Sequence, residues 1–385
     1  MKNSFIFSMG FIFLALSCSP APKLAEVEPE TEVKKEEIQH YTLSLAAAGD
    51  NLFHDSIIRS YFSNGRHDFS PVYSEIKSIV QNADVAFINQ ETVMAGTSFG
   101  YSGYPRFNTP QSLGQTLADS GFDIINLANN HAMDMGRNGL YNTLDFLDTI
   151  EGLTVIGARK EGESARIITK NNITLGFLSY TFSLNGIPLP GDNPNLVSMI
   201  NRDKMAEEAA ALRPLCDFLI VSMHWGEEYR LEPGREQAEL AVFLARHNVD
   251  LIIGHHPHVL QRTGTIIQRD GRKTLCFYSL GNFVSTQRER ERIIGGIMVI
   301  TFTKETSGQE IRNLSMSELG MIPVVTHYDR YFNNTKIYPL LIYSQEKLRE
   351  HGLRIHNDPN LSMNFFYSVL NRVNARIILD NPFVN

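Results

Sequence analysis

Three histidines follow an apolar run in the segment HNVDLIIGHHPHVLQ, residues 247–261. The run DLIIG has the length and composition of a buried strand, and His255, His256 and His258 come directly after it. One histidine at such a place is usually an ordinary polar residue, but three together favour metal ligation. His256-Pro257-His258 predicts two imidazoles on the same side of an extended backbone, which Pro257 would stiffen.

Four other apolar runs end in side chains of the same kinds. LSLAAAGDNLFH ends in Asp50 and His54, DVAFINQET in Asn89 and Glu91, DIINLANNHAMDMG in Asn129, Asn130, His131 and Asp134, and DFLIVSMHWGEEY in His224, Glu227 and Glu228. Each group alone has a structural explanation, such as a turn at Asp50 or a helix cap at Asn130. The carboxyl ends of strands form the ligand crevice of open α/β sheets, so the series predicts one shared site.

Histidine, carboxylate and amide side chains without thiolates indicate a divalent ion of the zinc, manganese or iron kind. A structural zinc site would usually contain cysteine and close its coordination. The number of candidate ligands is sufficient for two ions, and a pair of bridged ions is a common device for phosphoester hydrolysis.

The elements that must position these residues alternate between strands and amphipathic helices, which indicates an α/β domain. The apolar runs predict strands at residues 43–48, 85–89, 123–127, 154–156, 173–180, 218–223, 250–253, 274–280 and 296–302. Three helices are predicted from caps and periodicity at 109–121, 136–150 and 233–248, the first with Thr109 as its cap and Gly121 as its stop. After about residue 306 the pattern weakens, with some strand signal and a terminal helix near 361–376.

The composition of the chain excludes a nucleic-acid binder. The 385 residues carry a net charge of −7, with a hydrophobic fraction of 43%, and no basic stripe occurs. Cys216 and Cys276 lie in apolar runs, which predicts buried free thiols.

The first residues resemble an export signal. Lys2 precedes an apolar run from Phe5 to Leu16, which is too short to remain as a spanning helix. LALSC resembles a bacterial lipobox, so residues 1–18 are expected to direct lipidation of Cys18, with plain secretion as the alternative. Residues 19–39 are acidic and contain proline, which predicts a flexible tether. We therefore expect an exported lipoprotein, anchored to the bacterial membrane and facing the periplasm or the outer surface.

The motifs AAGDNLFH, INQET, NLANNHAMDMG, MHWGEEY, DLIIGHHPHVLQ and YSLGNFV together resemble the CapA/PgsA poly-γ-glutamate capsule-synthesis family. That family is similar to the calcineurin-like metallophosphatases. The resemblance covers about residues 41–303 and implies a four-layer αββα sandwich. It implies a domain at 40–305, with residues 306–385 as a C-terminal extension packing on it.

The resemblance also assigns roles to residues. Asp50 resembles a ligand of one ion, Glu91 a bridging carboxylate, Asn130 the amide ligand of a second ion, His131 the adjacent general acid, His224 a further ligand, and the GH…H pattern at 254–258 the last motif. The sequence departs from the phosphatase pattern twice. Leu52 stands where a ligand is usual, so His54 is expected to take that role. The last motif has one extra residue, so either His255 or His256 could pair with His258.

The sequence leaves three functional hypotheses open. The first is a metal-dependent hydrolase or transferase acting on a phosphoester or γ-glutamyl substrate. Arg106 in GYPRFNTP would hold an anion in this hypothesis, with an ordinary surface arginine as the alternative. The second is a non-catalytic accessory protein that docks on a membrane polymer synthase. The third is a surface-binding lipoprotein without a synthase partner.

Overall fold

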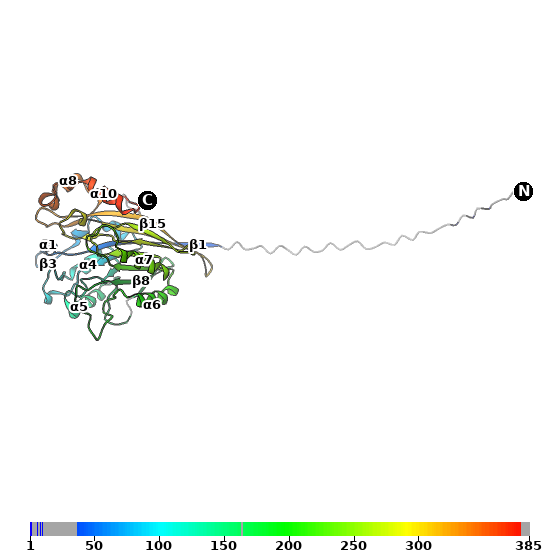
Figure 1. Ribbon diagram of the computed structural model, residues 1–385, viewed down its shortest axis with the longest axis horizontal. Helices are drawn as coiled ribbons and strands as arrows, with labels where there is room; N and C mark the ends of the chain where they lie inside the picture. The colour runs from blue at the N-terminus through cyan, green and yellow to red at the C-terminus, as the bar shows by residue number, and fades with distance from the viewer. Residues whose placement is uncertain (2–5, 7, 9, 11–36, 163–164, 379–385) are drawn as a thin grey trace. The chain divides into compact units, whose positions relative to one another are not determined.

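The computed structural model describes residues 37–162 and 165–378, together with positions 1, 6, 8 and 10. Cys18 and most of the predicted signal and tether therefore lie outside the described residues. The chain from Ile38 onward forms one unit, in which strands and helices alternate along the chain (Figure 1). Within the part of the chain that is described, no helix has both the length and the apolarity needed to cross a membrane.

Two β-sheets form the centre of this unit. The first contains β1 (Ile38–Asn51), β4 (Val85–Gln90), β5 (Ile124–Asn126), β6 (Thr154–Ile156), β13 (Asn282–Val284), β14 (Ile294–Ser307), β15 (Glu310–His327) and β16 (Lys336–Pro339). The second contains β7 (Arg166–Lys170), β8 (Ile173–Thr181), β9 (Phe218–His224), β10 (Leu251–His255), β11 (Thr263–Ile267) and β12 (Lys273–Phe277). Their orders are β16-β15-β14-β1-β4-β5-β6, with β13 paired to β1, and β11-β12-β10-β9-β8-β7.

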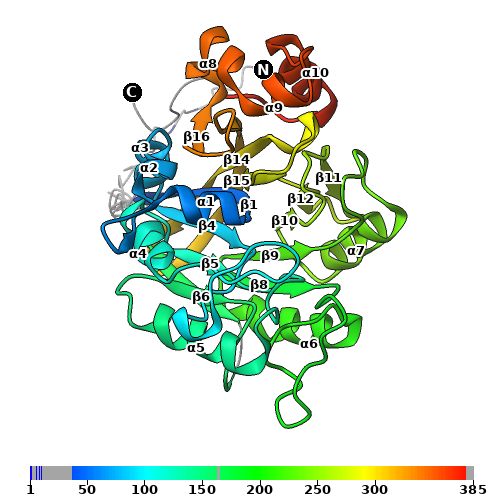
Figure 2. The same cartoon turned by 90° about the vertical axis from the view of Figure 1, so that its left-hand side faces the viewer.

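The helices are short, and the longest, with 13 residues, is α5, which follows the strand end that carries Asn130 and His131. Their bounds are Asp55–Ser60 (α1), Ser70–Tyr73 (α2), Lys77–Gln81 (α3), Ser112–Asp119 (α4), Gly136–Asp148 (α5), Arg202–Leu212 (α6), Arg235–Arg246 (α7), Gln345–Glu350 (α8), Gly352–His356 (α9) and Met363–Val373 (α10). A hairpin of β2 (Phe62–Ser63) and β3 (Arg66–His67) lies outside the two sheets. In Figure 2, α3 and α4 lie on one side of the strands and α7 on the other.

Alternation along the strands builds three apolar layers. In β1, Leu43 and Leu45 pack between the two sheets, whereas Ala46 faces the cluster that contains α1 to α5. In β9, Ile220 faces the first sheet and Val221 faces α6 and α7. Successive side chains of a strand point to opposite faces, so one strand serves two layers. The predicted four-layer αββα sandwich is confirmed.

Parallel pairing brings the site-bearing strand ends together. β1, β4, β5 and β6 run parallel in the first sheet, and β8, β9, β10 and β12 run parallel in the second. Each sheet therefore presents the carboxyl ends of its central strands at one edge. Asp50 and Glu91 come from the first edge, and His224 and His255 come from the second.

The residues after 306 continue the first sheet before they form helices. β15 pairs with β14 along its length, and α8, α9 and α10 then gather at one end of the unit (Figure 2). They share an apolar cluster with Ile294, Val325 and Tyr328. The sequence pattern missed β15 because its first half is exposed and shows no apolar run.

The predicted helix cap at Thr109 is wrong. Helix α4 begins after Gln111, which makes no side-chain cap bond, and Thr109 Oγ1 lies 2.7 Å from Thr92 Oγ1 instead. Gly121, with φ +101°, does stand just beyond the helix end. Cys216 and Cys276 are free thiols, as predicted, but only Cys276 is buried, and the predicted burial is wrong for Cys216, which is partly exposed.

Candidate metal centre

Asp50 and Glu91 bring two fully buried carboxylates to the edge of the first sheet. Asp50 Oδ2 lies 3.1 Å from His258 Nδ1 and accepts the His256 backbone N–H at 3.2 Å. Glu91 follows β4 directly, and its Oε1 lies 3.5 Å from His224 Nε2 and 3.6 Å from His258 Nε2. Both carboxylates are 0% exposed, so any charge on them must be compensated inside the protein.

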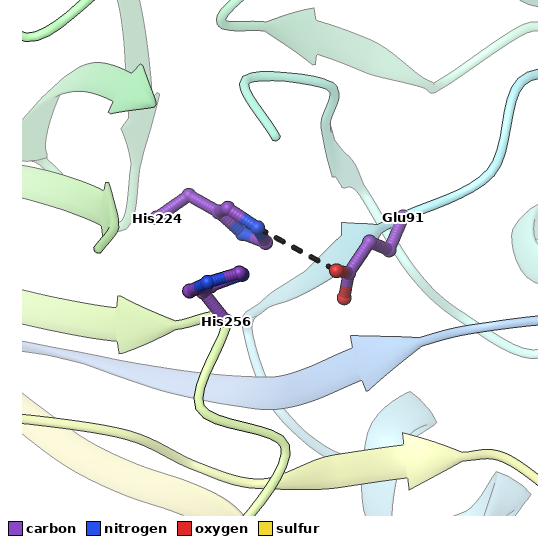
Figure 3. Close-up of side chains that lie close together, drawn as sticks. All are labelled: Glu91, His224 and His256. Atoms are coloured by element: carbon purple, nitrogen blue, oxygen red, sulfur yellow. Dashed lines mark ion pairs between the residues drawn. The ribbon is translucent and has the colours of Figure 1, made fainter. Parts of the chain in front are cut away.

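The second sheet supplies the imidazoles. His224 is the last residue of β9. Its Nε2, which lies 3.5 Å from Glu91 Oε1, also lies 2.9 Å from Oδ1 of Asn130, the predicted amide ligand. The rings of His224 and His256 have centroids 4.8 Å apart. Figure 3 shows His224 and His256 side by side, with the Glu91 carboxylate facing them from the other sheet.

These residues form overlapping groups in which one possible ligand atom of each member lies within 4.8 Å of the others. The groups are Glu91–His224–His256, Asp50–Glu91–His258 and Glu228–His256–His258. Glu91 belongs to both the first and the second group. The third group shares His256 with the first and His258 with the second. An arrangement with one shared carboxylate suits two neighbouring ions.

The hydrogen bonding of the cluster fits a metal. Both oxygens of Glu91, Nδ1 of His224 and Nδ1 of His256 are buried and have no hydrogen-bond partner among the described residues. Buried polar atoms without partners are rare and call for an explanation, such as an ion. Because these atoms belong to the residue types that ligate zinc, manganese and iron, the residues present fit such an ion.

The pKa values point the same way. Burial, and then the charges of Asp50, Glu228 and Asp134, raise the pKa of Glu91 well above its usual value. Burial opposes ionisation of Asp50, but interactions with His255 and His258 outweigh it and lower its pKa. Burial and neighbouring imidazoles lower the pKa of His224, and that of His256 to about 3. His224 and His256 are therefore neutral and able to ligate, and a cation would offset the cost of ionising Glu91.

His131 lies beside the cluster and belongs to none of its groups. Its Nδ1 lies 2.8 Å from Asp134 Oδ2, and Asn185 Nδ2 lies 3.4 Å from the same nitrogen. The Phe107 ring packs edge-on against the imidazole at 4.7 Å. A hydrogen bond from Nδ1–H to this carboxylate would leave Nε2 as the nitrogen available to a substrate.

The backbone prediction for His256-Pro257-His258 is wrong. His256 has φ +97° and His258 has φ +58°, so both lie in the left-handed region and the segment is a tight loop. Such conformations cost about 1–3 kcal/mol each and persist where surrounding contacts demand them. Here the His256 N–H is held by Asp50, and the turned backbone brings His256 and His258 into the ligand groups.

Besides His131, three further predicted site residues stand apart from the groups. His54 Nδ1 lies 3.2 Å from the Leu52 carbonyl oxygen and accepts the Thr286 N–H at 3.4 Å. His255 is fully buried and stacks on Phe87 at 5.8 Å, with its Nδ1 3.4 Å from Asp50 Oδ1. Arg106 is exposed. Their proposed roles stay predictions, and the geometry favours His256 as the partner of His258.

The ligand prediction left out residues that the structure brings to the site. Asn89 Nδ2 donates to Asp50 Oδ1 at 2.8 Å, and Asn126 Nδ2 donates to Asn89 Oδ1 at 2.8 Å. Ser179, from β8 of the other sheet, donates to Asn126 at 2.5 Å. This buried chain of hydrogen bonds orients Asp50 across both sheets. Glu228 and Asp134 follow strands in the sequence, but nothing local in the sequence indicates which carboxylate lies near the histidines.

The fold and the site together are those of a two-sheet α/β protein with a candidate metal site, built from histidines and carboxylates, at the ends of its strands. The profile of the family described as "Bacterial capsule synthesis protein PGA_cap" matches residues 44–287. The chain belongs to this family, and the predicted family is confirmed.

Two relatives have names in the same field. "Capsule biosynthesis protein CapA" of Bacillus anthracis is 33% identical over 186 residues, covering 45% of this chain and 42% of that protein. "PGA biosynthesis protein CapA" of Bacillus subtilis (strain 168) is 34% identical over 226 residues, covering 54% of this chain and 55% of that protein. The matches span about half the length of these relatives.

Solved structures resemble the chain at low sequence identity. A novel phosphatase from Mycoplasma pneumoniae is 14% identical with a TM-score of 0.45, covering 76% of this chain and 97% of that chain. A putative 5'-nucleotidase from Staphylococcus aureus is 16% identical with a TM-score of 0.43, covering 77% of this chain and 54% of that chain.

Proposed function

We propose that this protein is a lipid-anchored, metal-dependent hydrolase of the phosphoesterase type that takes part in making or exporting a poly-γ-glutamate capsule. The buried, unpartnered ligand atoms of Glu91, His224 and His256 carry the metal-dependent part. The names of the two Bacillus relatives support the capsule role. The substrate we expect is a phosphoester or an anionic γ-glutamyl polymer.

The chemistry divides between the ions and the chain. Bound divalent ions would polarise a phosphoryl or carbonyl oxygen and lower the pKa of water. Asp50, Glu91, Asn130, His224, His256 and His258 would hold them. His131, oriented through Nδ1 by Asp134, would give a proton from Nε2 to the leaving group. Phe107 packs against this imidazole and restricts its position.

One observation favours the accessory-protein alternative. His54, expected to supplement Asp50, lies in none of the ligand groups and is bonded to backbone atoms instead. Of the two predicted ligands in the motif AAGDNLFH, the groups then contain Asp50 and not His54. An incomplete set of metal ligands is compatible with a protein that binds partners without catalysing a reaction. In that case the protein would dock on a membrane polymer synthase, or bind at the surface without one.

Elemental analysis and turnover of bis(p-nitrophenyl) phosphate test the proposal together. We expect about two divalent ions per chain, and loss of metal and turnover in Asp50→Asn, Glu91→Gln or His224→Ala. Asp270→Asn, in an exposed turn between β11 and β12, is the control and should match the wild type. Bound metal without turnover of phosphodiesters or γ-glutamyl chains would favour the accessory role, and a folded protein that binds no metal would contradict the metal centre.

A further inference from the structure

The loop after β9 carries a third carboxylate toward the metal centre. Glu228 lies four residues beyond His224, and one of its oxygens lies within 4.8 Å of possible ligand atoms of His256 and His258. This group is connected to both inner groups, since His256 belongs to one and His258 to the other. Unlike the inner carboxylates Asp50 and Glu91, Glu228 is exposed, so it stands at the mouth of the cluster.

Backbone contacts hold Glu228 in this place. The Trp225 N–H donates to the His255 carbonyl oxygen at 3.1 Å, and the Tyr229 N–H donates to the Pro257 carbonyl oxygen at 2.8 Å. Glu228 therefore lies between two bonds that tie its loop to the histidine loop. Tyr229 has φ +66°, an uncommon conformation for a bulky residue, which indicates that the loop is held against its own preference.

The side-chain surroundings of Glu228 differ from those of its neighbour. Glu227 pairs with Arg230, with its Oε1 3.3 Å from Nη1. Glu228 has no such pair with Lys or Arg among the described residues, and burial and then the neighbouring Glu228 raise the pKa of Tyr229. The Arg292 guanidinium lies 3.4 Å from the Tyr229 ring centroid, which restricts that ring. Glu228 is thus a carboxylate without a Lys or Arg partner among the described residues, and it lies near the imidazoles of His256 and His258. The Nδ1 of His256 is buried and has no hydrogen-bond partner among those residues.

The inner groups leave room for another ligand. Asp50–Glu91–His258 and Glu91–His224–His256 offer three side chains each, with Asn130 beside the second. Divalent zinc takes at least four ligands, and manganese prefers more oxygen donors. A carboxylate at the mouth can complete a shell while leaving access from outside.

We propose that Glu228 is a further protein ligand of the metal centre, contributing a carboxylate oxygen at its open side beside His256 and His258. The inference rests on the proposed metal centre and adds to it a ligand from the loop after β9. Glu228 then acts on metal affinity directly, and the bonds of Tyr229 and Trp225 to the histidine loop position it.

The test is metal binding by the purified full-length chain, stripped with a chelator and titrated with Mn²⁺ or Zn²⁺ alone. Glu228→Gln keeps the size of the side chain but removes the charge, and Glu228→Asp keeps the charge but shortens the reach. Glu227→Gln is the matched control one position away, and His224→Ala is the reference for losing an inner ligand. Co²⁺-loaded protein gives a second readout, because its visible absorption reports the ligands around the ion.

We expect Glu228→Gln to weaken the more loosely held ion by about tenfold or more and to change the Co²⁺ spectrum. Glu228→Asp should lie between it and the wild type, and Glu227→Gln should match the wild type. The Glu228 and Glu227 variants should unfold at the wild-type temperature in chelator. An unchanged affinity and spectrum in Glu228→Gln, with metal lost from His224→Ala, overturns the role of Glu228 and leaves the metal centre standing. No metal in the folded wild type overturns both.

Discussion

At the scale of single residues, burying polar and charged side chains at the candidate metal centre costs free energy of folding. This cost indicates that the residues serve binding rather than stability. Glu91 is fully buried, neither of its oxygens has a hydrogen-bond partner among the described residues, and imidazole nitrogens of His224 and His258 lie 3.5 and 3.6 Å from its Oε1. Burying a charge without compensation costs several kcal/mol, so a protein that only needed stability would place an apolar residue there. His131 differs, because its Nδ1 already has a partner in Asp134.

This difference leads to a prediction about His131. His131→Ala should keep both metal and fold but slow turnover by about 10²–10⁴-fold, since a general acid contributes that much. The loss should shrink for substrates with an acidic leaving group, which needs no proton. Steady-state kinetics on two aryl phosphodiesters, with metal content measured alongside, check this. Asn130→Ala should instead lose metal, because Asn130 Oδ1 meets His224 Nε2 at 2.9 Å. If His131→Ala loses metal as fully as His224→Ala, then His131 is a ligand.

At the scale of elements, the strand ends approach one another so closely that glycine is required. A Cβ added at Gly254 in β10 would lie 2.0 Å from the Tyr278 carbonyl oxygen, and one at Gly49 in β1 would lie 2.1 Å from that of Gly281. Backbone atoms cannot yield as flexible side chains do. These glycines directly precede His255 and Asp50, so close packing sets the position of the site.

Gly254→Ala should therefore lower both stability and metal affinity. We expect a loss of about 1–3 kcal/mol in the free energy of unfolding, as for other overpacked positions. Urea unfolding in chelator measures the stability, and metal titration measures the site. Gly264→Ala in β11 is the control, because its nearest neighbour would be Tyr278 Cε2 at 3.8 Å. Equal losses in the two variants would contradict the role of close approach.

A second prediction concerns the C-terminal helices. His351 caps α9: its Nδ1 accepts the Leu353 N–H at 3.0 Å, and its Nε2 donates to the Thr326 carbonyl oxygen at 3.0 Å. Burial, and then the charge of His327, lower the pKa of His351 to about 3. The unfolded chain, with a usual pKa near 6.5, takes up the proton first as the pH falls. The stability from neutral His351 is therefore complete above pH 6.5 and is lost toward pH 3, by about 2 kcal/mol between pH 7 and pH 5.

Unfolding by urea at pH 7 and pH 5, in chelator, measures this loss. His351→Asn can still accept the Leu353 N–H but does not titrate, so its stability should fall less with pH than that of the wild type. His40→Asn, whose side chain is 62% exposed, is the control and should keep the wild-type slope. The same slope in His351→Asn would show that acid sensitivity arises elsewhere.

At the scale of the whole molecule, the four layers explain why the site sits at an edge. The apolar layer between the sheets excludes polar groups from the middle, so ligands from both sheets meet only where the strands end. The residues before Ile38 precede this unit, and the predicted lipidation at Cys18 would hold it at a membrane. The acidic tether would then set its reach.

Cys18→Ala tests the anchor. The variant should move from the membrane fraction to the soluble fraction, or accumulate as unprocessed precursor, because the lipid chain is the predicted attachment. Cell fractionation and the mass of the mature protein measure this. Cys216→Ala, at a free thiol within the folded unit, should remain membrane-associated. If Cys18→Ala stays membrane-associated and its signal is cleaved normally, the result contradicts the predicted lipid anchor.

The strand and helix pattern by itself predicted an α/β domain whose strand ends carry the candidate ligands, and the resemblance to the capsule-synthesis family implied the four layers. Apolar runs are local signals, and the polar residue that follows a parallel strand must lie at the carboxyl edge of its sheet, which places Asp50, Glu91 and His224. Only the tertiary structure decided that His256 rather than His255 joins the ligand groups, and that Glu228 faces them. Those outcomes depend on left-handed backbone at His256 and His258 and on the bond from Tyr229 to Pro257. Contacts between residues far apart in the chain hold both features, so no local pattern predicts them.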